Sequence, residues 1–545
     1  MKKFLASTIA CLLSISYVFG VEVVGGGGFW SYPSTWSNGE VLPDGSDFVT
    51  AGYGTLILDK DYSAGKITGN YSTTNFTFEG YPDTTFTFKY LGTSFECPEK
   101  AVDYSIAFDC NVNFTGEFLD VNTSVGGNST GSKDAKYTIK FLGETAFSGN
   151  SISFRTYDSA YNNVHSDGEI GRNADFRIAI LNKATTAGDL SMSSKTVTKT
   201  IPDPTPEDPD RTKDVWTTIL IPLTLEIGSK DNSAATMEVN GGVYLATSCN
   251  LDVYGTLNAT GKLSANSNAN STVNIYNGGT IQINQNIADT TTYLASEAYN
   301  MNISGTFKYH TASTQINQDF LNVAAGGKIV VNAGGQIVVE EVNSAAECHI
   351  VIKGNATLEY AEGSLENVNV RRIKFSGDGA TLTLNQSGVA EKVSPTFIAN
   401  NVSYNINIGA DSTVQDFHFW DVALGENSVD VNINFKNGSI LTLGSIVGGT
   451  GSNYYDKNIN FILTDFFDNG VTSSIKFTDS TFVKDTSSMA DAVLWIAKSF
   501  SSNGWEDFYV DTDGWLRATQ VIPEPSVFAV FFGIFALGYA IRRRK

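Results

Sequence analysis

Short segments in which apolar and polar residues alternate recur along most of the chain, and each is opened by glycine. The clearest pair is residues 325–331 (AGGKIVV) and 333–339 (AGGQIVV), with the order Gly-x-aliphatic-x-aliphatic. Related segments occur at 54–58, 255–258, 261–264, 279–283, 354–358, 379–384 and 438–443. A period of two places the aliphatic side chains on one face of a β-strand and the polar ones on the other. We therefore predict many short strands, with glycine supplying a positive φ at each corner.

The spacing between these segments is unequal, and this bears on the fold class. A β-propeller repeats blades of fixed length, whereas a β-solenoid accommodates loops of any size between the strands of a common stack. We therefore predict an all-β protein whose body is a parallel β-helix, or β-solenoid. A string of β-sandwich modules is the competing fold.

The start of the body carries a more specific pattern: Gly-Phe-Trp at 28–30, Thr-Trp-Ser-Asn-Gly at 35–39, Pro-Asp-Gly at 43–45 and Gly-Thr-Leu-Ile-Leu at 54–58. This order resembles the first rungs of autotransporter-like passengers, which are right-handed β-helices that often begin with a tryptophan-bearing cap. The resemblance implies a right-handed parallel β-helix displayed at a surface, and it implies no particular activity.

The strand pattern also suggests how the body is divided. We predict an N-terminal solenoid region at 21–198 and the main solenoid at 214–484. Between them, the Pro- and Asp-rich segment 199–213 either links two lobes or leaves one rung and returns to the next. Residues 485–520 are predicted to cap the stack, with a helix expected near 488–500 from its apolar spacing.

The amino-acid composition argues against two classes of function, nucleic-acid binding and an ordinary helical enzyme. The 545 residues include 57 acidic and 36 basic ones, which gives a formal charge of -21. Binding to nucleic acid requires a basic surface, so it is not expected. Gly, Asn, Ser and Thr are abundant while charged residues make up only 17%, which disfavours an ordinary helical enzyme.

Residues 1–20 have the three-part layout of a secretory signal peptide. Lys2 and Lys3 give a positive start, an apolar stretch follows at 4–19, and Gly20 precedes the predicted cleavage site. A buried first strand or helix is the alternative. A lipoprotein cleavage box at 8–11 is discounted because too short an apolar core would precede it.

The most specific feature of the sequence lies at 521–545. Pro523, Glu524 and Pro525 precede an uncharged apolar run at 526–541. The chain then ends in four basic residues: Arg542, Arg543, Arg544 and Lys545. A helix over the apolar run would be roughly 24 Å long, and flanking residues would let it cross a ~30 Å hydrocarbon core. We predict a single transmembrane helix in the inner membrane, with its basic end in the cytoplasm.

This order of elements resembles the PEP-CTERM sorting signal of Gram-negative bacteria. The resemblance implies that an exosortase, a membrane transpeptidase-like enzyme, recognises Pro523, Glu524 and Pro525 as substrate residues. It also implies that the exported protein is membrane-anchored first and then reaches the cell surface or the extracellular matrix. A plain tail anchor with an incidental triplet is the alternative.

Four cysteines remain after removal of the predicted signal peptide, and an exported chain meets oxidising surroundings. Cys97 and Cys110 are the candidate disulfide because the loop between them is short. Cys249 and Cys348 either pair across stacked rungs or serve as small buried hydrophobic residues. The absence of a Cys-x-x-Cys motif argues against a zinc site made of cysteines.

No residue is assigned a catalytic, metal-ligating or cofactor-binding role from the sequence. The histidines are scattered without the spacing of a metal or hydrolase site: His165, His310, His349 and His418. Related β-helix hydrolases carry an Arg-x-Lys motif, which Arg372-Ile373-Lys374 matches, but their Asp-Asp and Gly-His-Gly motifs are missing. Residues 511–514 begin like a calcium loop, but they are predicted to be a turn because Trp515 replaces a ligand.

We therefore expect a non-enzymatic surface or matrix protein whose structural or adhesive solenoid uses ladders of Thr, Asn and Gln as a contact face. A polysaccharide-degrading enzyme is one alternative, and it would bring Asp, Lys and Arg together on neighbouring rungs. An array of carbohydrate-binding modules is the other, and it would expose aromatic side chains, with Trp30, Trp36 and Trp420 as candidates. Extracellular polysaccharide is thus the candidate partner besides the exosortase.

Overall fold

The computed structural model of the chain describes most of the body and short pieces of the C-terminus. The described residues are 21–50, 53–69, 75–95, 103–123, 136–157, 175–194, 196–202, 214–220, 222–265, 271–285, 295–311, 318–341, 348–364, 372–385, 389–396, 402–419, 429–436, 438–448, 459–478, 500–521, 533–536, 539 and 542–543.

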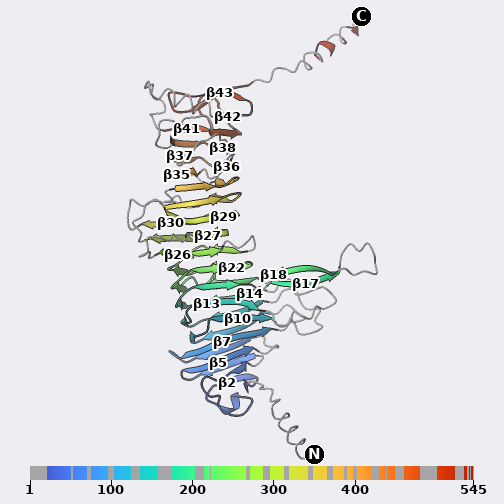
Figure 1. Ribbon diagram of the computed structural model, residues 1–545, viewed down its shortest axis with the longest axis vertical. Coiled ribbons are helices and arrows are strands. Elements are labelled where there is room, and N and C mark those ends of the chain that lie inside the picture. Colours follow the sequence, from blue (N-terminus) through green and yellow to red (C-terminus); the bar gives the residue numbers. More distant parts are fainter. Residues whose placement is uncertain are drawn as a thin grey trace, which may run out of the picture. The chain divides into compact units, whose positions relative to one another are not determined.

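The protein is all-β, and its strands form long parallel ladders consistent with a β-solenoid (Figure 1). The chain divides into two compact units, of which unit 1 comprises Met1–Gln315 and Gly334–Ala346, and unit 2 comprises Ile316–Ala333 and Glu347–Lys545. Sandwich sheets are antiparallel, so the parallel pairing excludes a string of sandwich modules among the described residues. The all-β prediction is confirmed.

Unit 1 stacks its strands in three columns, and most turns of the chain add one strand to each column. Column A contains β2 (Gly26–Phe29), β4 (Tyr53–Leu58), β6 (Asn75–Gly80), β8 (Asp103–Asp109), β11 (Lys136–Phe141), β14 (Asp175–Ile180), β19 (Leu223–Ile227), β22 (Cys249–Val253), β25 (Thr272–Ile275) and the end of β27 (Ser296–Ile303). Column B contains the first halves of β5 (Tyr62–Gly69) and β7 (Thr85–Phe95), then β9 (Asn111–Phe114), β12 (Thr145–Phe147), β15 (Lys183–Thr186), β20 (Thr236–Val239), β23 (Thr256–Ala259), β26 (Thr280–Gln285), β28 (Thr306–Thr311) and β30 (Gln336–Glu341). Column C contains β1 (Val21–Glu22), β3 (Phe48–Thr50), the second halves of β5 and β7, β10 (Phe118–Thr123), β13 (Ile152–Tyr157), β16 (Leu190–Ser193), β21 (Val243–Leu245), β24 (Leu263–Ala265) and the start of β27.

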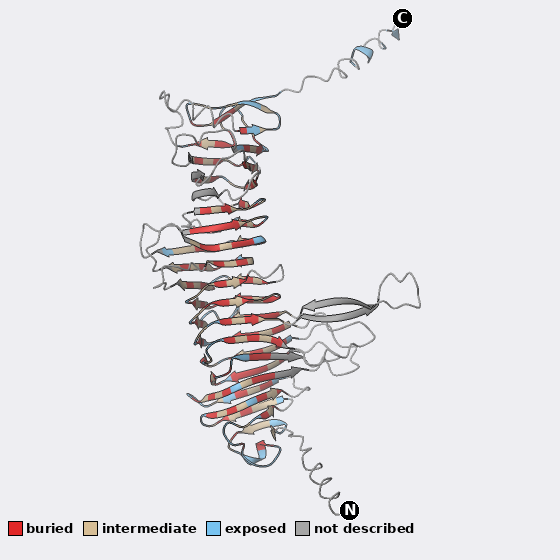
Figure 2. Ribbon diagram, viewed as in Figure 1, coloured by how far each residue is buried: buried red, intermediate tan, exposed pale blue. Residues whose placement is uncertain are grey.

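Buried residues alternate with less buried ones along the strands (Figure 2). In unit 1 the buried side chains repeat at the same position of successive strands and form its core. The ring of Phe108 stacks between Phe78 and Phe141, with centroids 4.8 and 5.2 Å away and interplanar angles of 5° and 9°. Further along the chain, Leu257, Ile281 and Phe307 occupy one register position of column B. Alternation therefore buries one residue in two, as the sequence predicts.

The first rung of unit 1 ends in buried tryptophans. Trp30 and Trp36 pack edge to face at 4.9 Å and are almost completely buried. Their indole N–H groups donate to the carbonyl oxygens of Leu42 and Trp30, at 3.1 and 2.9 Å. Both rings therefore close the apolar core at this end, and neither presents a face for stacking on a sugar. A 3₁₀ turn, η1 (Pro33–Thr35), lies between them.

Glycine is needed at the corners for two different reasons. The expectation that every corner glycine has a positive φ is therefore wrong. Gly334 has a φ of +75°, which favours glycine. Gly279 does not, but a Cβ there would overlap the carbonyl oxygen of Val253 in the preceding turn. Close approach of stacked turns, rather than backbone handedness, selects glycine at the second kind of corner.

An antiparallel arm leaves the solenoid between β16 and β19. It consists of β17 (Thr196–Pro202) and β18 (Asp214–Leu220), which pair with each other as a separate two-stranded sheet (Figure 1). Residues 203–213 lie outside the described residues. The segment predicted at 199–213 therefore begins inside β17, and the strands before and after the arm both belong to unit 1.

Unit 2 contains two columns of parallel strands and an antiparallel end. One column contains the second half of β29 (Gln318–Val331), β32 (Thr357–Tyr360), β34 (Thr381–Leu384), β36 (Val402–Ile408), β38 (Val429–Phe435), β40 (Ile459–Thr464) and β42 (Phe500–Ser502). The other contains the first half of β29, β31 (Cys348–Lys353), β33 (Arg372–Ser376), β35 (Val389–Thr396), β37 (Ser412–Phe419), β39 (Leu441–Gly448) and β41 (Ile475–Phe477). β43 (Trp505–Val510) and β44 (Leu516–Gln520) then pair antiparallel.

Three predicted segments lie wholly or mainly outside the described residues: the signal peptide at 1–20, the helix at 488–500 and most of the apolar run at 526–541. The pieces 533–536, 539 and 542 are helical and exposed. Among the described residues, no helix has the length and apolar character needed to cross a bilayer.

Candidate functional site

Hydrogen-bonded polar columns run along the outward faces of the stacked strands. In unit 2, Asn434 donates its amide to Asn407 at 2.8 Å, and Asn407 donates to Thr383 at 3.0 Å. In unit 1, Asn302 donates to Asn274 and Asn274 to Asp252, both at 2.8 Å. Parallel in-register strands put like positions one above another, so each amide reaches the next turn.

The first charged group, named the Arg177 cluster, comprises Asp175, Arg177, Glu226 and Asp252 on β14, β19 and β22 of unit 1. Arg177 donates from Nε to Asp175 at 2.7 Å and from Nη1 to Glu226 at 3.1 Å. Glu226 and Asp252 are register partners on neighbouring strands. The two carboxyl-bearing residues therefore lie about one strand spacing apart, ~4.8 Å between backbones.

The pKa values of two acids in the Arg177 cluster are raised above their ordinary values. Burial raises the pKa of Glu226, although Arg177 acts in the opposite direction. Burial also raises the pKa of Asp252, and the hydrogen bond from Asn274 opposes this. Shifted pKa values of this kind occur at functional sites and also in structural ion-pair networks.

The second charged group, named the Asp319 cluster, comprises Asp319, His349 and Lys374 on β29, β31 and β33 of unit 2. The Asp319 Oδ1 atom lies 3.1 Å from His349 Nδ1 and accepts a hydrogen bond from Lys374 Nζ at 2.9 Å. The His349 side chain is completely buried. Burial tends to raise the pKa of Asp319, but its bonds to His349 and Lys374 outweigh burial and lower it.

These two clusters bear on the alternative that the protein is a polysaccharide-degrading enzyme. Lys374 of the motif Arg372-Ile373-Lys374 pairs with Asp319 from two turns earlier. The enzyme alternative predicts Asp, Lys and Arg together on neighbouring rungs, so this pair meets it only in part. No sequence motif connects Asp175 and Arg177 with Glu226 and Asp252, because the two pairs are joined only by the stacking register. Among the described residues, no group of three or more His, Cys, Asp or Glu is arranged to hold a metal ion.

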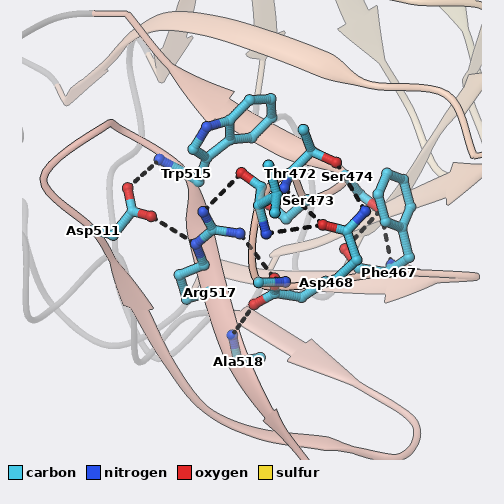
Figure 3. Close-up of polar contacts among 12 residues, drawn as sticks. Phe467, Asp468, Thr472, Ser473, Ser474, Asp511, Trp515, Arg517 and Ala518 are labelled. Carbon is cyan, nitrogen blue, oxygen red and sulfur yellow. Dashed lines mark hydrogen bonds and ion pairs between the residues drawn. The ribbon is translucent and has the colours of Figure 1, made fainter.

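The C-terminal end of unit 2 is fixed by a buried arginine (Figure 3). Arg517 donates to Asp511 at 2.6 Å, to Asp468 at 2.9 Å and to the carbonyl of Val471 at 3.0 Å. The Asp511 carboxylate also accepts the backbone N–H groups of Asp513 and Trp515, both at 2.9 Å. Residues 511–514 thus form the predicted turn, and its first carboxylate is engaged by these internal donors.

The remaining candidate residues are dispersed. Cys110 and Cys249 are buried and form no disulfide with another described cysteine, and burial raises the pKa of each thiol to about 12. Cys97 lies outside the described residues, so its disulfide with Cys110 stays a prediction, and the side chain of Cys348 is not described. His310 lies 3.7 Å from Glu340, which also pairs with Lys308 at 2.7 Å.

The structure describes few of the sorting residues. Arg542 and Arg543 are exposed, and the backbone N–H of Arg543 donates to Tyr539 at 3.1 Å, as in a helical turn. The others lie outside the described residues: Pro523, Glu524, Pro525, Arg544 and Lys545. The same holds for His165, Trp420 and the side chain of His418.

Comparison of the chain with family models, with curated proteins and with solved structures found no match. The charged clusters and polar columns must therefore be interpreted from their own chemistry.

Proposed function

We propose that this chain is an exported surface or matrix protein whose right-handed β-solenoid serves as a structural or adhesive scaffold. In this proposal, an exosortase recognises Pro523, Glu524 and Pro525 while the segment 526–541 spans the inner membrane. The protein then moves to the cell surface or the extracellular matrix. Right-handed winding is favoured because connections between parallel strands of L-residues are almost always right-handed.

The observation that supports the scaffold is the set of polar columns. The side-chain amide of Asn434 donates a hydrogen bond to Asn407 one turn away, and Asn407 donates to Thr383 on the next turn. Such columns make a regular face of amide and hydroxyl groups whose side chains are held by hydrogen bonds within the chain. A surface of this kind suits repeated weak contacts, whose sum is strong when many engage together.

The sorting proposal is tested by changing Pro523 and Pro525 to alanine in the producing organism. We expect surface delivery, followed by fractionation and surface labelling, to be lost and the protein to accumulate in the membrane fraction. The matched control changes Pro204 and Pro206 to alanine, which alters two prolines of the arm segment and leaves the tail intact. Normal delivery of the tail variant would show that the triplet is not a signal.

The Arg177 cluster supports a second candidate function, cleavage of polysaccharide. A retaining glycosidase needs one carboxyl group with a raised pKa and a second about 5–5.5 Å away. Glu226 and Asp252 are register partners on adjacent strands, and burial raises the pKa of each. In this assignment Asp252 is the acid, and Glu226, whose ionised form is favoured by its hydrogen bond from Arg177, is the second carboxyl group. Incubation with neutral and acidic polysaccharides, with and without calcium, separates the two functions. Released oligosaccharide that disappears in Glu226→Gln would establish an enzyme, whereas binding without release would support the scaffold.

A further inference from the structure

The arm formed by β17 and β18 is incomplete as a sheet. Its strands pair only with each other among the described residues, in a register that runs from Thr196 opposite Leu220 to Pro202 opposite Asp214. A lone two-stranded ribbon is marginally stable in water, and a third strand or a packed face is normally needed. Its outer edges also present rows of backbone N–H and C=O groups that can accept another strand.

The two edges of the arm differ in how strongly their sequences discourage pairing with another strand. β17 carries Lys199 and ends at Pro202, and both residue types discourage edge pairing. β18 has a single charge at its first residue, and residues 215–220 (VWTTIL) contain no charge, proline or glycine. A six-residue segment of this composition is the sequence signature of homotypic strand pairing. By its sequence, the edge of β18 is therefore the less protected of the two against pairing.

The sequence of β18 is self-complementary around Thr217. If two copies of β18 pair antiparallel with Thr217 at the centre, Val215 of each copy lies opposite Ile219 of the other. In the arm itself, Val215 is the register partner of Ile201, and Ile219 that of Val197. These positions alternate along each strand, so they share one face. Each outer row of the joined sheet would then contain four β-branched apolar residues, and cross-strand pairs of this kind stabilise a sheet.

We propose that β18 pairs antiparallel with β18 of a second copy of this chain, centred on Thr217, and joins the two arms into a four-stranded sheet. The interface is isologous, so it closes as a dimer with two-fold symmetry. The partner is a second copy because the same residues supply both halves of the match.

Cysteine cross-linking of the full chain in a non-ionic detergent tests the register. Residue 217 would face its own copy at a Cα separation of roughly 4.5–5.5 Å, within the range of a disulfide. Its register partner Lys199 would be three strand spacings from its copy, about 14 Å, which is too far. We therefore expect Thr217→Cys to give a disulfide-linked dimer on mild oxidation, while Lys199→Cys and the unmodified chain do not.

Assembly without cross-linking is measured by sedimentation velocity over a range of concentrations. Thr217→Lys would set two lysines opposite each other in a row that already holds both Lys199 side chains, so dimerisation should weaken about tenfold or more. Circular dichroism should be unchanged, because the arm is separate from the solenoid strands. The proposal is overturned by a monomer with no Thr217→Cys cross-link, by a cross-link from Lys199→Cys instead, or by an unaltered dimer in Thr217→Lys.

Discussion

Replacement of Arg517 by methionine removes the cation that holds the C-terminal end of unit 2. The Arg517 side chain is 9% exposed and that of Asp468 is 8% exposed, so the pair is shielded from water. The substitution leaves the carboxylates of Asp468 and Asp511 without their shared partner. Breaking a buried pair from one side costs about 3–5 kcal/mol, chiefly because the remaining charge stays buried.

Native-state amide exchange measures this loss locally, because the end of a repeat stack opens without global unfolding. About 3 kcal/mol corresponds to a roughly hundredfold loss of protection in β43 and β44. The matched control is Lys328→Met, which removes an exposed partner of Glu359. It should change the amide protection of β29 and β32 by about 1 kcal/mol or less. Equal effects of the two variants, or no effect of Arg517→Met, would refute the reasoning.

The same network predicts the sign of a pH effect. Burial tends to raise the pKa of Asp511, but the Trp515 N–H and Arg517 outweigh burial and lower it. A carboxyl group with a lowered pKa in the folded state adds stability above its unfolded pKa, near 3.9. The added protection of β43 and β44 should therefore be complete at neutral pH and decline as the pH falls below about 4.

Three further outcomes are expected elsewhere in the molecule. Phe108→Ala should cost about 3–5 kcal/mol, because it opens a cavity in a stacked aromatic column, and exchange of the β8 amides would report it. Asn407→Leu removes two side-chain hydrogen bonds and should cost about 1–2 kcal/mol, measured by thermal denaturation against the parent chain. In the reduced chain, alkylation of Cys110 and Cys249 at pH 8 should be slow until the chain unfolds, because burial raises both thiol pKa values to about 12.

Local pattern predicts the strands of this protein well, and it predicts their stacking poorly. The segment 325–339 already shows two strands, because the alternation of side chains depends only on neighbouring residues. The Asp319 cluster depends on which turn lies above which, and its members are 30 and 55 residues apart in sequence. Loops of different length separate these turns, so no fixed spacing marks the cluster.

The antiparallel arm was missed for a related reason. The Pro- and Asp-rich composition of 199–213 indicates a linker or a long loop. The alternation of apolar and polar residues in 196–202 and 214–220 resembles that of any other strand. Only the partner distinguishes these strands from those of the stack, and a partner is a long-range property. The return of the chain was one of the two alternatives for 199–213, but the pairing of the two flanking strands with each other was not predicted.

The two charged clusters are not equivalent as sources of catalysis. A general acid working near neutral pH needs a pKa raised toward that pH. His349 and Lys374 hold the pKa of Asp319 below its ordinary value, so Asp319 is better suited to pinning neighbouring turns together. Glu226 and Asp252 have the opposite shift. If polysaccharide cleavage is detected, it should therefore fall at least a hundredfold in Glu226→Gln or Asp252→Asn. Asp319→Asn should retain it, and the reverse pattern would move the active site to unit 2.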